Sequence, residues 1–162
     1  MRLWIAVLVC VGFCEIASVT AEDKNDTPKS EVKGTLTLDG KNYKLESGLA
    51  YETTKFDKKR IVIYLSEKPL DTAKLKASFK KNGNDEDFFA TAPHVMLSFD
   101  DKGELFQLAL YARGANIILQ GDPNIKAEAA VKDGSAKGTA KSAKPDKDYT
   151  LEVAFEVKLI KP

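Results

Sequence analysis

His94 is the only histidine in the chain and the first residue to consider for acid–base chemistry, because the ordinary pKa of an imidazole lies close to neutral pH. It follows Pro93 and opens an apolar segment, 95–99. No Gly-x-Ser-x-Gly turn is present to supply a nucleophile for such a base. We expect His94 to be a strand-edge histidine with an ordinary hydrogen bond. A small hydrolase centred on His94 remains an alternative function.

An oxygen-rich run follows, with Asp85, Glu86 and Asp87 after Asn82 and Asn84. Ca²⁺ takes six to eight oxygen ligands, so this run could contribute to a cation site. It lacks the Asp-x-Asp-x-Asp-Gly order and the glutamate at position 12 of a calcium loop. We interpret it as a solvated acidic loop, and the sequence predicts no catalytic, cofactor-binding or metal-binding residue and no cofactor.

Residues 55–81 carry an excess of lysine and arginine, whereas the whole chain has 25 Lys and Arg against 24 Asp and Glu. The near-neutral balance excludes a nucleic-acid partner of the usual strongly basic kind. A local basic stretch could bind an anionic polymer or lipid headgroups. The interpretation we favour is a lysine-rich, solvated face on one strand and one helix.

The first 21 residues have the pattern of a secretory signal peptide. Arg2 precedes an apolar segment over 3–13, and Val19-Thr20-Ala21 fits the small-residue cleavage site. The apolar segment is too short to span a bilayer, so we expect no membrane span in the mature chain. Cleavage would remove Cys10 and Cys14, the only cysteines. An exported domain without disulfides fits a bacterial periplasm or exterior better than an animal secretory pathway.

Residues 22–31 are polar and read as a flexible leader, which leaves 32–162 as a single β domain. Alternating apolar and polar residues, separated by Asp-Gly and similar turns, predict about eight to ten short strands. Asp100, Asp101 and Glu104 are interpreted as hairpin-turn residues. The predicted strands are 33–38, 42–45, 49–53, 60–66, 95–99, 104–112, 116–120, 125–131, 135–142 and 150–159.

One segment has a helical period. Apolar residues recur through about 71–81, Asp71 can cap the start, and Asn82-Gly83 ends the pattern. Many short strands and a single helix predict an all-β fold, an antiparallel sandwich or a closed or partly open barrel. The small residues Ala136, Gly138 and Ala140 share one strand face, where close packing is the expected reason.

Three segments resemble a group of small exported bacterial proteins of uncharacterised function: 34–45 (GTLTLDGKNYKL), 61–70 (IVIYLSEKPL) and 149–156 (YTLEVAFE). The shared pattern is a signal peptide, a G-x-L-T-x-x-G-K-x-Y hairpin, a V-x-L-S-x-K-P-L strand-to-helix joint and a terminal Y-x-x-x-x-x-F strand. The resemblance implies export and a β-rich fold. It carries over no activity and no site residue.

The function we expect is an exported, non-enzymatic binding or accessory β domain, periplasmic or extracellular. Its partner would be a small molecule, a protein or a cell-envelope polymer. The motivation is the lack of a nucleophile constellation, a metal set and a phosphate loop in the sequence. A second alternative, beside the hydrolase, is a barrel-type carrier of a small apolar ligand, since the five tyrosines could line an interior site.

Overall fold

The computed structural model describes residues 30–55, 57–85, 88, 92–112, 115–146 and 148–162. The predicted signal peptide and most of the predicted leader therefore lie outside the described residues. In chain order the elements are β1 (Glu31–Leu38), β2 (Lys41–Leu45), β3 (Ser47–Lys55), β4 (Lys58–Ser66), α1 (Thr72–Asn82), β5 (His94–Phe99), β6 (Leu105–Ala112), β7 (Ala115–Gln120), β8 (Ile125–Lys132), β9 (Ser135–Ser142) and β10 (Tyr149–Ile160).

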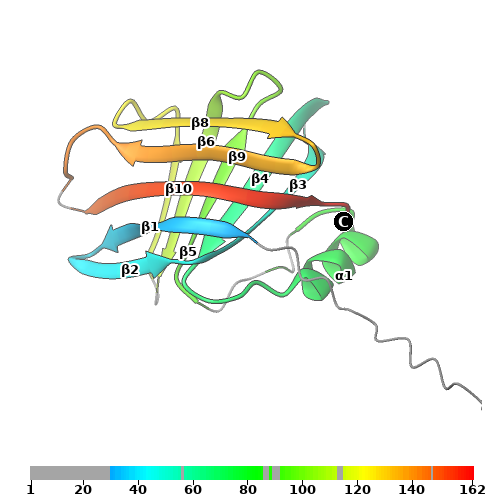
Figure 1. The fold of residues 1–162 in the computed structure, drawn as a ribbon, viewed down its shortest axis with the longest axis horizontal. Coiled ribbons are helices and arrows are strands. Elements are labelled where there is room, and N and C mark those ends of the chain that lie inside the picture. Colours follow the sequence, from blue (N-terminus) through cyan, green and yellow to red (C-terminus); the bar gives the residue numbers. More distant parts are fainter. Residues whose placement is uncertain (1–29, 56, 86–87, 89–91, 113–114, 147) are drawn as a thin grey trace, which may run out of the picture.

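The strands form two layers, which Figure 1 shows crossing one another. Sheet A has the order β2-β1-β10-β9-β8 and sheet B the order β3-β4-β5-β6-β7. The long strand β10 lies in the middle of sheet A, and at its end Leu159 and Ile160 pair in parallel with Ala50 and Tyr51 of β3. On the opposite side a single bridge joins Glu104 to Glu128 of β8. The two sheets are thus one strongly curled sheet that forms a half-barrel.

The main core fills the space between the sheets. Strand alternation sends every second side chain inward, and the inward positions of both sheets are almost entirely aliphatic or aromatic. The fully buried members with the largest side chains are Leu36, Leu38, Leu45, Ile63, Leu65, Leu97, Phe99, Leu108, Leu110 and Leu151. Side chains therefore occupy the interior that a barrel-type carrier would need for its ligand.

A second core lies on the outer face of sheet B. The helix α1 places Leu75 and Phe79 against Leu49, Tyr51 and other outward residues of β3 and β4. The Asp71 side chain accepts a hydrogen bond from the backbone N–H of Lys74, and Gly83 ends the helix with φ of 72°, a conformation that favours glycine. The sequence 60–66 is apolar on both faces because β4 has a core on each side.

A close contact inside sheet A depends on a glycine. Gly138 of β9 pairs with Phe155 of β10 and with Ala129 of β8. A methyl group at Gly138 would lie 2.8 Å from Cζ of Phe155, and closer still to the carbonyl oxygen of Glu128. The aromatic ring thus occupies the space over the glycine, which confirms close packing as the reason for the small residue there.

Within the part of the chain that it describes, the structure confirms the all-β fold, the ten predicted strands and the single helix, and the element ends differ from the predicted ones by no more than two residues. The order of the strands was not predicted. In particular, β10 pairs with β1 and with β3, which are both far from it along the chain.

Gly138→Ala is expected to destabilise the protein by about 1–3 kcal/mol, because a methyl group forces Phe155 and the β8 backbone to move. Urea unfolding followed by circular dichroism measures the change. Thr139→Ala, at the exposed neighbouring position, is the control and should lie within about 0.5 kcal/mol of the wild type. Equal stability of Gly138→Ala and the wild type would contradict the packing argument.

Candidate functional site

A cluster of part-buried polar side chains lies under α1, on the outer face of sheet B. Tyr51 of β3 and Tyr64 of β4 both donate their hydroxyl hydrogen to the same oxygen, Oδ2 of Asp85, and the distance from Tyr64 is 2.8 Å. The ring of Tyr51 meets Phe79 edge-on at 5.1 Å, and that of Tyr64 meets Phe88 at 5.2 Å. Asp85 thereby ties the segment after α1 to the sheet.

His94 extends this cluster along β5. Its ring stacks on Tyr111 of β6 with 4.5 Å between centroids and lies 6.0 Å from Tyr64. Nδ1 lies 2.9 Å from the carbonyl oxygen of Ala92. A carbonyl can only accept, so Nδ1 carries the hydrogen and the neutral ring has its free lone pair on Nε2. The expected ordinary hydrogen bond is present, at a side chain that is only 6% exposed.

Burial shifts the pKa values of the three tyrosines and of the histidine. It raises the pKa of Tyr51 and Tyr64 far above the ordinary value, and the neighbouring Asp85 carboxylate adds to the rise. Burial also raises the pKa of Tyr111. For His94 burial lowers the pKa, and the hydrogen bond to Ala92 only partly offsets this. At neutral pH the three hydroxyls and the imidazole are therefore uncharged.

This arrangement of side chains is better suited to anchoring Asp85 on the sheet than to hydrolytic catalysis. A hydrolytic triad needs an imidazole that bridges a nucleophile and a carboxylate. In the described residues the hydroxyls of Tyr51 and Tyr64 go to Asp85, and no hydrogen bond joins His94 to any of them. Glu86 and Asp87, the rest of the predicted acidic loop, lie outside the described residues. Asp85 itself is part-buried and bonded to two tyrosines, whereas the sequence predicts a solvated side chain at this position.

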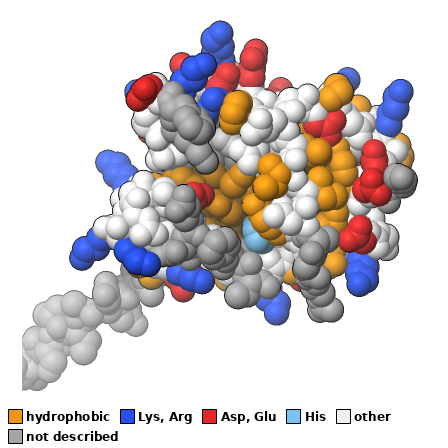
Figure 2. Space-filling view, turned by 180° about the vertical axis from the view of Figure 1, so that it is seen from behind, with side chains coloured by type: hydrophobic (Ala, Val, Ile, Leu, Met, Phe, Trp, Pro, Cys, Tyr) orange, Lys and Arg blue, Asp and Glu red, His pale blue; other side chains and the backbone are white. Residues whose placement is uncertain are grey.

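Beyond α1, the outer face of sheet B is less covered. Figure 2 shows hydrophobic side chains gathered over the middle of this face, with the imidazole at their margin. Tyr64, Met96, Ala109 and Ile118 stand side by side on four neighbouring strands. Ile118, at the end of the row, is 53% exposed.

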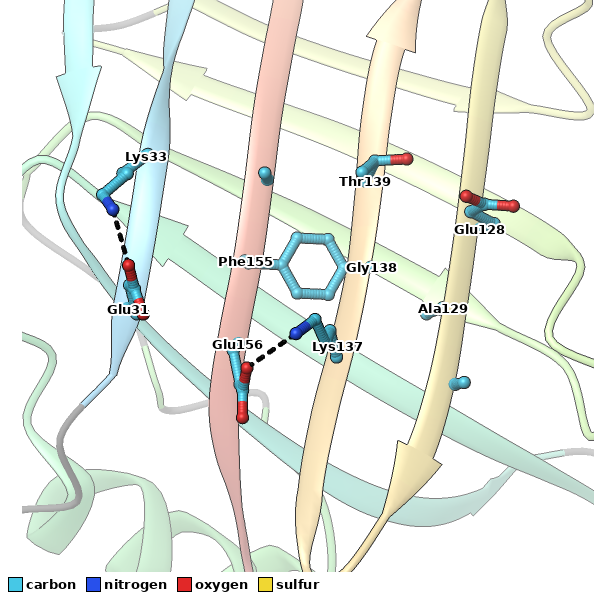
Figure 3. A pocket seen from close by; sticks show the side chains of 11 residues that line it. Glu31, Lys33, Glu128, Ala129, Lys137, Gly138, Thr139, Phe155 and Glu156 are labelled. Atoms are coloured by element: carbon cyan, nitrogen blue, oxygen red, sulfur yellow. Dashed lines mark hydrogen bonds and ion pairs between the residues drawn. The ribbon is translucent and has the colours of Figure 1, made fainter.

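The outer face of sheet A carries a groove of about 590 Å³, within the size range of small-ligand sites. It runs across β1, β10, β9 and β8 (Figure 3). Small side chains such as Ala154 and Ala130 form its floor, and longer charged side chains rise at its sides. No motif in the sequence indicates this groove, because it depends on side-by-side placement of residues from strands far apart in the chain.

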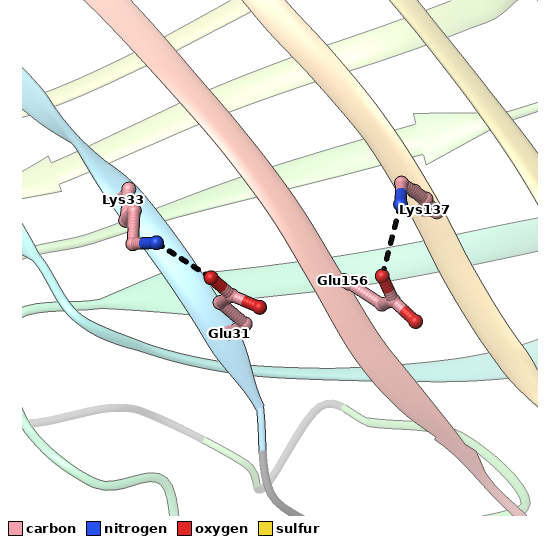
Figure 4. Close-up of polar contacts among 4 residues, drawn as sticks. All are labelled: Glu31, Lys33, Lys137 and Glu156. Carbon is pink, nitrogen blue, oxygen red and sulfur yellow. Dashed lines mark hydrogen bonds and ion pairs between the residues drawn. The ribbon is translucent and has the colours of Figure 1, made fainter.

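The charges at the groove are mostly paired (Figure 4). Lys33 lies 2.5 Å from Glu31, and Lys137 lies 3.1 Å from Glu156. Burial is slight at all four, so these pairs contribute little to stability. Glu128, on the far side, forms no ion pair with the residues that the structure describes. It is the one groove carboxylate of that part of the chain without a lysine partner.

The basic stretch 55–81 is divided by the fold. Lys58 and Lys59 lie exposed at the start of β4, whereas Lys74 and Lys80 lie on the exposed side of α1. Arg60 is buried, and its guanidinium carbon lies 3.9 Å from the centroid of the Phe106 ring. That contact is a cation–π interaction on the outer face of sheet B.

Comparison with known proteins gives no relative: no family model matches the chain, and no curated protein or solved structure does. The resemblance to small exported bacterial proteins thus stays a prediction. Among the described residues, no three His, Cys, Asp or Glu side chains are grouped so that they could hold a metal ion. Within the same part of the chain, no helix has the length and apolar character needed to cross a membrane.

Asp85→Ala is expected to lower the free energy of unfolding by about 1–3 kcal/mol, because two part-buried tyrosine hydroxyls lose their acceptor. Thermal and urea unfolding measure the loss. Asp101→Ala, at an exposed turn, is the matched control. In the double variant Tyr51→Phe, Tyr64→Phe the further loss from Asp85→Ala should be much smaller. Additive effects of the three substitutions would show that the hydroxyls do not depend on Asp85.

His94 should make stability depend on pH. Its folded pKa is lower than its unfolded value of about 6.5, so the unfolded chain binds the proton more readily. Its stabilising contribution is therefore full above pH 6.5 and is lost as pH falls through the folded pKa. The stability difference between wild type and His94→Gln should shrink as pH falls from about 8 to 5. A constant difference across this range would contradict the lowered pKa.

Proposed function

We propose that the chain acts outside the cytoplasm as a non-enzymatic binding domain, and that the groove on the outer face of sheet A is its ligand site. The observation that carries the proposal is the side chain of Glu128, which has no ion-pair partner among the described residues and lies beside a floor of small apolar side chains. The strands that form the groove are held by continuous ladders between β1, β10, β9 and β8. A site on such strands is organised before the ligand arrives.

The groove favours a ligand with an apolar body and one positively charged end. Lys33 and Lys137 are each already paired with a glutamate, so the groove has little free positive charge with which to bind an anion. Glu128 can pair with an ammonium or guanidinium group, while Ala154 and Ala130 contact the apolar part. A charge-assisted hydrogen bond of this kind contributes about 1.5–3 kcal/mol.

The two alternatives gain less support from the geometry. A hydrolase centred on His94 would need a nucleophile within reach of Nε2. The ring of Tyr111 stacks on the imidazole instead, and the ring of Tyr64 lies tilted against it at 6.0 Å. An interior carrier would need an empty space between the sheets, where buried leucines and Phe99 are packed. The surroundings of His94 and the packed core between the sheets therefore both favour a ligand site on the surface.

Nuclear magnetic resonance titration with hexylammonium and with hexanoate tests the proposal. Hexylammonium should shift the amide signals of β8, β9 and β10 around the groove, and hexanoate should not. Glu128→Gln should weaken the response about tenfold, as expected for one charge-assisted hydrogen bond. Glu67→Gln, an exposed carboxylate outside the groove, is the control and should leave it unchanged.

A second pair of variants tests the groove by shape. Ala154→Leu should fill the floor and abolish the response, whereas Thr150→Leu, on the same face of β10 but outside the groove, should not. Equal responses to the two probes, or an unaltered response in Ala154→Leu, would overturn the assignment. Native mass spectrometry of the protein from its own host would then show whether a ligand is retained elsewhere.

A further inference from the structure

Sheet B ends in a strand that carries no charge. β7 pairs with β6 along one side, and among the described residues no backbone hydrogen bond leaves its other side. Its sequence, ANIILQ, contains no lysine, arginine, aspartate, glutamate or proline. Edge strands usually carry such residues, because an open row of N–H and C=O groups otherwise pairs with another chain.

The edge strands of sheet A, β2 and β8, are protected in this way. β2 is short and presents Lys41 and Lys44. β8 presents Lys126, Glu128 and Lys132, and the bridge from Glu104 already occupies part of its edge. Because β2 and β8 of the same chain carry charged residues, a general scarcity of charged residues does not explain why β7 has none.

The exposed side chain on β7 continues an apolar row. Tyr64, Met96, Ala109 and Ile118 are cross-strand neighbours on the outer face of sheet B. Tyr64 and Met96 pack into the cluster under α1. Ile118 ends the row and is 53% exposed, so a further strand beside β7 would bury apolar surface and lower the free energy.

The sequence of β7 complements itself around Ile118. In antiparallel pairing, directly opposite residues point to the same face of the sheet. A two-fold axis at Ile118 therefore places Ile118 opposite Ile118 of the partner subunit on the outer face. Asn116 then meets Gln120 of the partner subunit, amide against amide. On the inner face Ile117 meets Leu119 of the partner subunit, apolar against apolar.

We propose that β7 is a homodimer interface, in which the β7 strands of two copies pair antiparallel about Ile118 and join the two B sheets into one. Hydrogen bonds fix the turn that follows β7. The Tyr149 hydroxyl donates to Asp122, and the Asp122 side chain accepts from the backbone N–H of Asn124 at 2.9 Å. Such an interface is isologous and closes at two subunits. It is independent of the groove on sheet A.

Sedimentation equilibrium of the protein, expressed from the full-length sequence and purified after export, tests the proposal. The wild type should show a dimer that dissociates on dilution. Ile118→Lys and Ile118→Glu should each be monomeric, because like charges would lie opposite one another across the two-fold axis. An equimolar mixture of the two variants should form a heterodimer that added salt weakens.

The mixture tests the register, since opposite charges meet only if position 118 faces itself. Val131→Lys, at a side chain on β8 that is 37% exposed, is the matched control and should remain dimeric. Circular dichroism should show that all variants keep the fold, as expected for substitutions at exposed positions.

Three outcomes would overturn the proposal. The first is a wild type that stays monomeric at the highest soluble concentration. The second is a dimer that Val131→Lys dissociates and Ile118→Lys does not, which would place the interface on β8. The third is a mixture of the Lys and Glu variants that stays monomeric, which would exclude pairing about Ile118.

Discussion

The structure depends on one strand, β10. Its first ten residues form ladders with β1 and β9, and its last residues pair with β3. Because β3 begins sheet B, this single strand joins both sheets into one hydrogen-bonded unit. Its inward residues, among them Leu151 and Val157, fill the core between them. The fold therefore rests on contacts between distant parts of the chain, which are costly in loop entropy and must all form together.

This arrangement of the sheets explains why the side chains that could take part in catalysis stabilise the fold instead. With one face of sheet B closed by sheet A, the segment formed by α1 and the residues up to Asp85 covers part of the other face. Asp85 fixes that segment through two tyrosine hydroxyls, and His94 fills the space between Tyr64 and Tyr111. The part-buried Asp85 side chain accepts from two hydroxyls, and Nδ1 of His94 donates to a backbone carbonyl, so these polar atoms find partners within the fold. The open groove, where Glu128 forms no ion pair with any residue that the structure describes, lies on the outer face of sheet A, on the opposite side of the half-barrel.

Local patterns were enough to predict the elements, but not their partners. The strand 150–159 alternates cleanly, and the residues around Asp39-Gly40 form the expected hairpin, because period and turn chemistry act over a few residues. The pairing of β10 with β3 has no local signal. Likewise, the spacing of Tyr51, Tyr64 and Asp85 along the chain gives no indication that they meet, since only the register of β3 against β4 brings the two rings together.

The same distinction explains why the sequence predicts β7 as a strand but does not indicate that one of its edges is unpaired. Alternation of apolar and polar residues shows which face of a strand is buried, but not whether the backbone groups along each of its two edges are paired. A charged side chain at position 118 would cost the isolated molecule little, because this position is half exposed. β2 and β8 show that the chain places lysine and glutamate on its other edges. Isoleucine at 118 therefore has no explanation within one subunit, and pairing with a second copy supplies one.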